Sequence, residues 1–465
     1  MSIITINPLT RISGFLEIEV KVENNKAVDA KSSGLLFRGF EKMLQDREPL
    51  DAVYFTQRIC GICSNAHSMA SSLALESALG ILPNENDRMI RDFMHGCEYV
   101  QNHIRHFYLY TIPDFATGPK LEPVYNNNHT DFRLPKDIND RITDNYINAI
   151  KYSRLAHTAL AELGGKAPHS HGIFVGGTTV NIDAYKIVKV KSIVKEIKNF
   201  VENNMIEDVY TISEYYKDYF NIGKGYGNLL SYGVYDKYLE ADLSYVKPGV
   251  YINGSFLSFN PDKITESIYN SWFIQDLKSS NKNDVEPDLD KEGAYSFVKA
   301  PRYNGYPLEV GPLARMILSN NYDNKVSTMD RTIARVLETK KVLEIMEQLL
   351  DRIAFKKASQ NQYNIPEEAY GSGLIDTTRG ALGHWIYIKN KKINRYNIIT
   401  PSVWNCSPAD NVGVKGVIEQ AIIGTEIKDM MHPVEIGRIV RSFDPCISCA
   451  THVVSDRFSP VKIII

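Results

Sequence analysis

The chain has 465 residues, of which 43% are hydrophobic and 23% are charged, and this is the composition of a folded globular protein rather than of a disordered or fibrous chain. Its 53 basic and 55 acidic residues leave a net charge of -2, so we expect no nucleic-acid partner. The first residues lack the basic and apolar runs of an export signal, and no apolar run reaches the roughly 18 residues of a membrane span. These features leave open whether the protein stays in the cytoplasm or associates with a membrane.

The first predicted elements are two strands followed by a helix. Residues 16–22 alternate apolar with charged side chains, and the polar turn at 23–26 leads into a second extended run, which predicts a small antiparallel sheet. Helical spacing then covers residues 64–79 and stops at a glycine. This places Cys60 and Cys63 at a helix N-terminus, where a thiolate is favoured over a thiol.

Most of the remaining chain has helical patterns. Further helices are predicted at 84–112, 148–163, 184–203 and 328–355. Residues 385–400 favour a hairpin, whereas 116–145 and 275–312 are rich in turn-forming residues and are interpreted as irregular connections. We therefore expect a mainly α fold with small β (α+β), in which a large helix-bundle body carries small antiparallel sheets.

Four of the six cysteines form two CxxC pairs, Cys60/Cys63 and Cys446/Cys449, at opposite ends of the chain. Four thiolates suit a soft or borderline metal. Structural zinc sites usually bring their second pair within a few tens of residues, because they staple a small fold. Spacing alone therefore leaves structural zinc and a catalytic metal about equally open.

The residues around the cysteines carry more information. Arg-Ile-Cys-Gly-Ile-Cys-Ser-Asn-Ala-His at 58–67 and Asp-Pro-Cys-Ile-Ser-Cys-Ala-Thr-His at 444–452 closely resemble the two metal-binding signatures of nickel-iron hydrogenase large subunits. Other segments match family motifs in the family's order, at 38–41, 299–303, 309–315, 378–385 and 401–405. The resemblance extends from about residue 5 to residue 452 and is greatest to the respiratory uptake type.

The resemblance implies a nickel ion held by Cys60, Cys63, Cys446 and Cys449. The second cysteine of each pair would bridge to an iron that carries one carbon monoxide and two cyanides. The implied activity is heterolytic cleavage of H2, with the electrons passing to an iron-sulfur small subunit. Such a partner is required, because Cys97 and Cys406 alone are too few to hold an iron-sulfur cluster and are interpreted as buried thiols.

The same resemblance implies a route for the proton. Cys446 would receive it and pass it to Glu41, whose pKa would have to be raised by burial. Arg379 is a reluctant base, because its reference pKa is about 12 or higher, and is given an electrostatic role. Asp114 and Asp444 match acidic residues around this site and are expected to pair with Arg379.

Further ligands and contacts are implied for this centre. Ser402 and the backbone near Arg379 would hydrogen-bond the cyanides, and His67, one helical turn after the first pair, could donate to a metal-bound sulfur. A magnesium ion would be bound by Glu48, the carbonyl oxygen of Ile398, His452 and water. By contrast, His95, His103 and His106 are interpreted as packing and surface residues.

The resemblance also divides the chain into a catalytic body at 1–452 and an extension at 453–465. In the family such an extension is removed by a maturation protease after nickel-insertion proteins have acted. On composition alone, the extension would be an edge strand. A quinone-reductase subunit of respiratory complex I is disfavoured, because those relatives have lost the four cysteines. A hydrogen-sensing regulatory subunit and a zinc-binding scaffold subunit remain as alternatives.

Overall fold

The computed structural model describes residues 2–119, 129–275, 285–323, 325–360 and 362–450. Its α-helices are α1 Phe40–Met43, α2 Asp51–Gln57, α3 Ser64–Leu79, α4 Glu85–Arg105, α5 Lys136–Gly164, α6 Ala184–Phe200, α7 Ile206–Tyr215, α8 Pro312–Leu318, α9 Thr328–Arg352, α10 Pro401–Asn405, α11 Val417–Ile422, α12 Val434–Ser442 and α13 Ile447–Ala450. Its strands are β1 Ser2–Ile6, β2 Leu16–Glu23, β3 Lys26–Gly34, β4 Ile173–Phe174, β5 Gly177–Thr178, β6 Leu229–Ser231, β7 Gly249–Ile252, β8 Ser255–Ser258, β9 Ile264–Ser267, β10 Phe273–Gln275, β11 Val285–Pro287, β12 Ala300–Tyr303, β13 Glu368–Thr377, β14 Gly380–Lys389 and β15 Lys392–Ile399.

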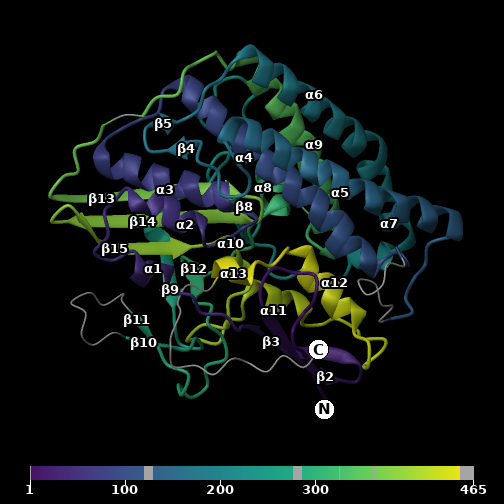
Figure 1. Cartoon of the computed structure of the whole chain (residues 1–465). Coiled ribbons are helices and arrows are strands. Elements are labelled where there is room, and N and C mark those ends of the chain that lie inside the picture. The colour runs from purple at the N-terminus through teal and green to yellow at the C-terminus, as the bar shows by residue number, and fades with distance from the viewer. Residues whose placement is uncertain (1, 120–128, 276–284, 324, 361, 451–465) are drawn as a thin grey trace.

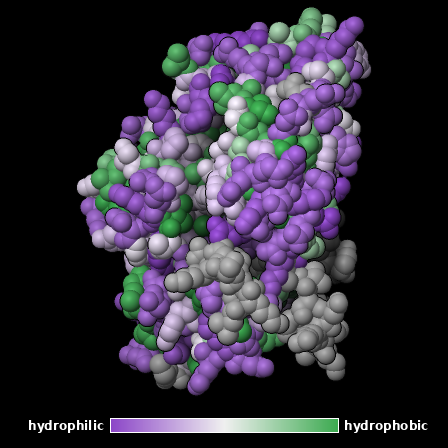
Figure 2. All heavy atoms as spheres, turned by 90° about the vertical axis from the view of Figure 1, so that its left-hand side faces the viewer, coloured by the Kyte–Doolittle hydropathy of each residue, from purple (hydrophilic) through white to green (hydrophobic). Residues whose placement is uncertain are grey.

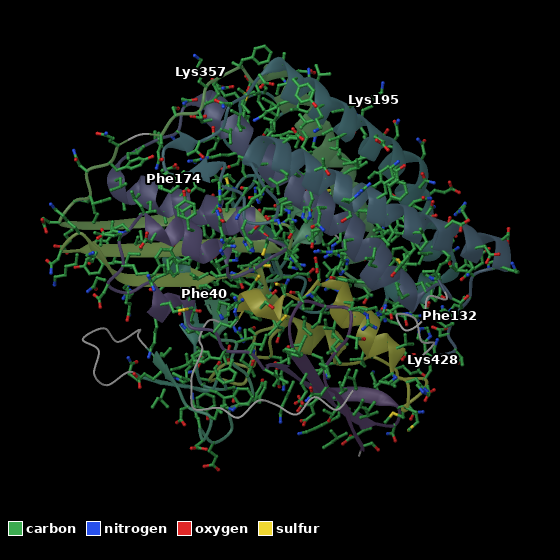
Figure 3. All side chains as sticks on the ribbon, viewed as in Figure 1. Phe40, Phe132, Phe174, Lys195, Lys357 and Lys428 are labelled. Carbon is green, nitrogen blue, oxygen red and sulfur yellow. The ribbon has the colours of Figure 1, made fainter. Side chains whose placement is uncertain are left out.

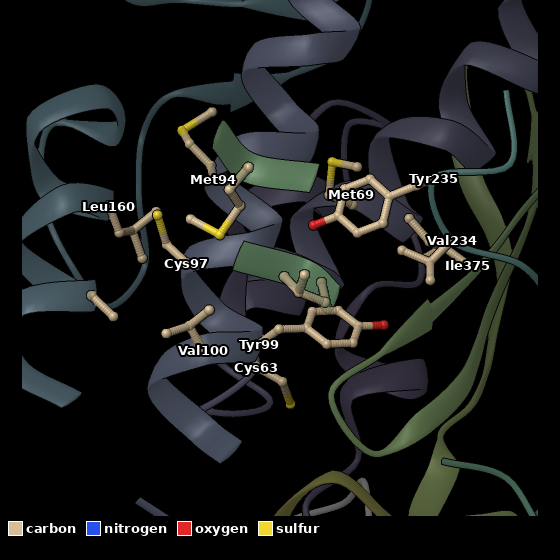
Figure 4. Packing of buried hydrophobic residues seen from close by; sticks show 14 of the residues in the cluster. Cys63, Met69, Met94, Cys97, Tyr99, Val100, Leu160, Val234, Tyr235 and Ile375 are labelled. Carbon is tan, nitrogen blue, oxygen red and sulfur yellow. The ribbon is translucent and has the colours of Figure 1, made fainter. Parts of the chain in front are cut away.

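The long helices α4, α5, α6 and α9 lie side by side and form the main body in the upper half of Figure 1. Helix α4 begins where the side chain of Asn84 accepts a hydrogen bond from the Asp87 amide at 2.9 Å. Figure 4 shows Met94 and Cys97 of α4 among the buried side chains, with Leu160 of α5 beside them. This apolar contact fixes α4, whose Glu98 accepts hydrogen bonds from the backbone amides that follow Cys63.

Helix α3 lies against a three-stranded sheet of order β13-β14-β15. The approach is very close, because a Cβ atom at Gly373 would lie 1.9 Å from the Ala70 carbonyl oxygen, and one at Gly371 would lie 2.0 Å from that of Ala74. Only glycine leaves room for a helix backbone at this distance. The first cysteine pair is thereby held next to the β13–β14 turn, which carries Arg379.

The two ends of the described chain meet in a second, smaller core. The sheet β1-β2-β3 packs with α11 and α12 around Leu16, Ile18, Val20, Ile436 and Ile439, all of which are buried. The segment before β2 also contacts the second cysteine pair, since Ser13 forms a β-bridge with Cys446, which follows α12. The fold thus brings together residues from opposite ends of the sequence.

Several predictions from the sequence are confirmed. The N-terminal antiparallel sheet is present, and α3 spans residues 64–79 and ends at Gly80 in the left-handed conformation. The helices expected at 84–112, 184–203 and 328–355 correspond to α4, α6 and α9. The α+β fold class and the helix-rich body with small antiparallel sheets are confirmed as well.

Other predictions were wrong in part. Helix α5 begins at Lys136, within the stretch expected to be irregular. Its first turns are rich in Asp, Asn, Lys and Arg, which masked the apolar positions Ile138, Ile142 and Tyr146 that pack into the core. The hairpin at 385–400 has a third strand, β13, whose glycines and half-exposed side chains hid it. Two short strands, β11 and β12, lie within 275–312.

The exterior is mixed in character. Figure 2 shows one face of the molecule, on which hydrophilic side chains predominate and hydrophobic ones are scattered. Within the described ranges, no helix is both long enough and apolar enough to cross a membrane.

Candidate metal centre

The four paired cysteines come together in the interior of the protein. Cys60 Sγ lies 3.7 Å from Cys446 Sγ, Cys63 Sγ lies 3.4 Å from Cys449 Sγ, and the sulfurs of Cys446 and Cys449 are 2.9 Å apart. All four residues are at most 4% exposed. Figure 3 shows side-chain sulfur atoms near the centre of the molecule. The prediction that both pairs share one site is thus supported by their geometry.

Local backbone contacts orient each pair. The amides of Ile62 and Cys63 point at Cys60 Sγ, at 3.2 and 3.3 Å, and Cys63 is the N-cap of α3. These amides stabilise negative charge on that sulfur. In the second pair, the Cys446 amide donates to the Ser402 hydroxyl oxygen at 2.9 Å. The Ile447 amide donates to the Ser13 carbonyl at 2.7 Å, so the N-terminal segment also holds this pair.

The spacing of the sulfurs fits a metal ion. A tetrahedral ion with metal–sulfur bonds of about 2.3 Å needs its ligands roughly 3.7 Å apart. The Cys60–Cys446 and Cys63–Cys449 distances of 3.7 and 3.4 Å are close to this value, whereas the Cys446 and Cys449 sulfurs, at 2.9 Å, lie closer together. Cys60, Cys63 and Cys449 form a group whose sulfurs lie within 4.8 Å of one another. Hydrogen bonds from the neighbouring thiols, that of Cys449 foremost, hold the pKa of Cys446 well below its usual range. A buried cluster with this donor set suits a soft or borderline cation.

Arg379 is fully buried beside the cysteines and is held by Asp444. Its Nη2 donates to Asp444 Oδ1 at 2.9 Å and to Asn102 Oδ1 at 3.0 Å, while its Nε donates to the Asp444 carbonyl at 2.9 Å. Burial alone would lower the pKa of Arg379, but Asp444 and the cysteine sulfurs raise it well above its usual value. Nη1 is buried and has no hydrogen-bond partner among the described residues, so it remains available to a bound group.

The expected pairing of Arg379 with Asp444 is confirmed, whereas that with Asp114 was wrong. The Asp114 carboxylate instead receives Arg441 Nε at 2.7 Å and Arg441 Nη2 at 2.8 Å, and it also pairs with Arg11. These arginines outweigh the effect of burial and lower the pKa of Asp114 below its usual range. Asp114 therefore anchors the N-terminal segment to α12.

His67 lies one turn into α3 and is almost completely buried. Its Nδ1 lies 3.1 Å from His384 Nε2 on β14, and His384 Nδ1 lies 2.8 Å from the Tyr396 hydroxyl on β15. The Tyr396 hydroxyl donates to Ser71 Oγ on α3 at 3.0 Å. Burial lowers the pKa of His67 to about 3, against an opposing attraction by Cys446, so its ring is neutral near neutral pH.

The two carboxylates of the N-terminal segment lie in different surroundings. Glu41 Oε1 accepts a hydrogen bond from the Ile398 amide at 2.9 Å, and its Oε2 lies 3.8 Å from Lys299 Nζ. Glu48 bonds Lys392, and its side chain is 60% exposed. The structure thus brings Glu41, and not Glu48, to Ile398. His452 and the extension at 453–465 lie outside the described residues.

Several residues near the centre were missed or misread in the sequence. Asn102 contacts both Arg379 and Asp444. Glu98 accepts hydrogen bonds from the Asn65 and Ala66 amides at 2.8 and 3.0 Å, and burial raises its pKa to about 8. An acidic residue on the apolar stripe of a predicted helix was the available signal for Glu98. His95, His103 and His106 were interpreted as packing and surface residues; all three are buried, so the packing part is confirmed and the surface part was wrong.

A buried ionic network holds the turn that carries Arg379. Arg315 on α8 donates from Nε and Nη2 to both oxygens of Glu338, each at 2.7 Å. It also donates to the carbonyls of Thr377 and Thr378, at 2.8 and 3.1 Å. Burial would raise the pKa of Glu338, but Arg315 lowers it to about 2, so this carboxylate is charged. Arg315 therefore fixes the backbone just before Arg379.

Comparisons with known proteins agree with this geometry. A family model described as nickel-dependent hydrogenase matches residues 38–119, 111–326 and 318–452. The large subunit of the periplasmic NiFeSe hydrogenase of Desulfomicrobium baculatum is 36% identical, over 97% of this chain and 95% of its own length. The uptake hydrogenase large subunit of Bradyrhizobium diazoefficiens is 30% identical, over 97% of this chain and 95% of its own length.

Solved structures match equally well. The Ni-Fe-Se hydrogenase from D. vulgaris Hildenborough in the reduced state superposes with a TM-score of 0.92 at 39% identity, covering 97% of this chain and all of the matched one. Some of these relatives are named NiFeSe hydrogenases, whereas this chain has cysteine at all four positions of its two CxxC pairs. The matches span the whole described body, including both cysteine pairs. The chain therefore belongs to the nickel-dependent hydrogenase family.

Proposed function

We propose that this chain is the catalytic large subunit of a nickel-iron hydrogenase, which cleaves H2 reversibly into two protons and two electrons. The observation that carries the proposal is the convergence of four buried sulfurs from opposite ends of the chain near Arg379, a buried cation whose Nη1 has no hydrogen-bond partner among the described residues. A structural zinc site would need neither this cation nor a link between the two chain ends.

The residues present fit a nickel ion, which Cys60, Cys63, Cys446 and Cys449 would hold. By the family resemblance, Cys63 and Cys449 would also bind an iron that carries one carbon monoxide and two cyanides. When bound, this pair of metals supplies the acceptor for a hydride. Ser402 accepts from the Cys446 amide, so its own hydroxyl proton is available to a cyanide. Arg379 offers Nη1 to the same group of ligands.

The protein side chains divide the remaining work. By the family resemblance, Cys446 would be the sulfur that receives the proton of H2. Arg379 remains a cation because Asp444 stabilises its charge, so its role is electrostatic. Asp444 orients Arg379 through their salt bridge. Asp114 has an indirect role. Its salt bridge to Arg441 fixes α12, and the second cysteine pair follows this helix in the chain.

A magnesium ion is proposed at Ile398, with Glu41 rather than Glu48 as its carboxylate ligand. Glu41, Glu266, Ile398 and Ala450 line a small cavity of about 40 Å³, and Ala450 lies two residues before His452. A cavity of this size has room for water as well as an ion, as magnesium requires. This placement favours a metal-ligand role for Glu41 over the role of proton relay.

Partners follow from the family and from the cysteine inventory. An iron-sulfur small subunit would carry the electrons away, since Cys97 and Cys406 are both buried within separate packed regions.

We further propose that residues 1–452 form the mature body. Nickel-insertion proteins would act first, and a maturation protease would then remove 453–465. An intact mass of the active protein that still includes the extension would contradict this order.

Infrared spectroscopy and metal analysis of the purified complex test the proposal. Sharp bands in the metal carbonyl and cyanide region, together with nickel, are expected from wild type, and Cys60→Ser should lose both. Protein with its extension removed that contains zinc alone and shows no such bands would instead support the zinc scaffold. Bands without H2 turnover would support a hydrogen sensor.

A matched pair of variants tests the magnesium site. Glu41→Gln should lose the bound magnesium, because a neutral amide is a weaker ligand for this hard cation. Glu48→Gln, seven residues along the chain, should retain it, because Glu48 bonds Lys392 at the surface. Loss of magnesium from Glu48→Gln alone would overturn the reassignment.

A further inference from the structure

The sheet β13-β14-β15 packs on α3 with one face and lines a hollow with the other. Gly371 and Gly373 of β13 lie against α3, so the residues that alternate with them point to the opposite, outer face. Paired residues on neighbouring strands share a face. The outer face therefore carries six side chains that line a hollow of about 350 Å³, namely Tyr370, Ser372, Trp385, Tyr387, Arg395 and Asn397.

A larger hollow of about 590 Å³ adjoins the first. The two share four lining residues, Pro261, Trp385, Arg395 and Asn397. In the larger hollow, Ile264 of β9, Ile268 just after this strand and Ile399 of β15 supply apolar surface. We call the two hollows together the outer groove. It combines aromatic and aliphatic surface with the cation Arg395, where the two hollows join.

The last described residue lies next to this groove. Ala450 lines the small cavity proposed for magnesium, together with Glu266 and Lys299. Both Glu266 and Lys299 also line the larger hollow of the outer groove. The extension at 453–465 thus begins three positions after a residue whose cavity borders the outer groove.

The charges of the groove leave one cation without a counter-ion. Lys299 Nζ lies 3.8 Å from a carboxylate oxygen of Glu41 and 3.8 Å from one of Glu266. Arg395, by contrast, forms neither an ion pair nor a side-chain hydrogen bond within the described part of the chain. A half-buried arginine in a groove of this kind suits an acidic group on whatever occupies the groove.

The extension has the composition and the length to occupy the groove. It contains one acid, Asp456, and its residues 463–465 are three isoleucines. An extended chain rises about 3.3 Å per residue, so the six steps from Ala450 to Asp456 span up to about 20 Å. By the same measure, the four steps along β15 from Ile399 to Arg395 span about 13 Å. Asp456 can therefore reach Arg395, and the isoleucines can reach the aromatic rings beyond it.

We propose that residues 453–465 dock in the outer groove until they are removed, with Asp456 paired to Arg395 and residues 463–465 packed on the outer face of the sheet. Burial of these isoleucines against the aromatic rings supplies the apolar part of the contact. The docked extension lies next to the proposed magnesium site, and its removal uncovers that side of the body. The inference rests on the proposed boundary at residue 452.

Hydroxyl-radical footprinting of the unprocessed chain tests the docking. The chain is purified from a host that lacks the maturation protease, and it is compared with a form that ends at His452. Oxidation of Tyr370 and Trp385, measured by mass spectrometry, should be several-fold slower in the unprocessed chain, because Tyr370 is 65% exposed in the described body. Tyr185 on α6, which is 71% exposed, should be oxidised equally in both forms.

A charge exchange tests the proposed ion pair. In the unprocessed chain, Arg395→Glu and Asp456→Arg should each restore fast oxidation of Trp385, and the double variant should be protected again. Arg154→Glu is the matched control, because Arg154 is an exposed arginine on α5 that does not line the groove. Ile464→Asp tests the apolar contact without changing the body at all, and it too should restore fast oxidation.

The outcomes separate the docking from the proposed function. Equal oxidation of Trp385 in the unprocessed and the shortened chain would overturn the docking. Protection in both forms that rises with protein concentration would assign the groove to a second copy, and protection that requires the small subunit would assign it to that partner; either result also overturns the docking. An active complex whose mass still includes 453–465 would contradict the proposed maturation, whereas the footprint of the unprocessed chain would still decide the docking.

Discussion

Replacing Arg315 by methionine should destabilise the protein strongly, because it leaves two buried carboxylates without their cation. Arg315 is 0% exposed and makes two hydrogen bonds to Glu338, one to Asp376 at 3.3 Å and two to backbone carbonyls. Breaking a buried ion pair by removing one partner costs about 3–5 kcal/mol. Glu338 keeps its bonds to His103 and Tyr245, each at 2.8 Å, so we expect the loss to stay within this range.

The pH dependence gives the loss a signature. In the native protein the pKa of Glu338 is about 2, against 4.5 in an unfolded chain, so its ionised form stabilises the fold above pH 4.5 and this contribution disappears as the pH falls toward 2. A difference of that size corresponds to about 3 kcal/mol. Without Arg315 the pKa of Glu338 rises. The stability difference between wild type and Arg315→Met should therefore be largest near neutral pH and should shrink in acid.

Thermal unfolding of the purified complex at one scan rate, over a series of pH values, measures this difference. The double variant Arg315→Met/Glu338→Gln should recover part of the loss, because it removes the unpaired charge. Arg331→Met is the control for an ion pair of similar burial, since Arg331 binds both oxygens of Glu309 at 2.8 and 2.7 Å away from the Arg379 turn. A loss below about 1 kcal/mol, or one that does not change with pH, would refute the reasoning.

Three further changes have expected outcomes. Gly373→Ala forces a Cβ atom to within 1.9 Å of the Ala70 carbonyl and should cost at least about 1–3 kcal/mol in thermal unfolding; an unchanged unfolding temperature would contradict the close packing of α3. Gly14→Ala places a Cβ atom 2.8 Å from the Ser448 amide at a φ of +89°, and should reduce the nickel content measured by elemental analysis; full nickel loading would show that the second cysteine pair tolerates this shift. Wild type should lose stability as the pH rises from 4.5 to 8, because the folded pKa of Glu98 is raised to about 8, and Glu98→Gln should remove that slope; equal slopes would mean that Glu98 is ionised in the fold.

Much of the centre could be predicted from the sequence because its ligands lie in two short, distinctive segments. The helix start after Cys63 and the stop at Gly80 are local signals, and the structure confirms both. The pairing of Arg379 with Asp444 was also predictable, since Asp444 lies two residues before Cys446. Short-range sequence patterns were therefore enough to predict the helix that follows the first cysteine pair and the partner of Arg379.

Long-range choices between similar groups could not be predicted. Glu41 and Glu48 lie in the same polar stretch, and only the docking of α1 on β15 shows which of them reaches Ile398. Asp114 was assigned to Arg379, but Arg441, three residues before Asp444, forms its salt bridge instead. A sequence gives the number of charges in a region, whereas the pairing of those charges depends on how distant segments pack.

The meeting of the two cysteine pairs has a consequence for the chain as a polymer. A metal bound by both pairs joins residues 386 positions apart, and thus closes nearly the entire described chain into a single ring. By the relation used for covalent cross-links, closing a loop of this length removes about 6 kcal/mol of conformational free energy from the unfolded state. The metal would then act as a cross-link as well as a reactive centre. Separation of either end of the chain from the body would first require a metal–sulfur bond to break.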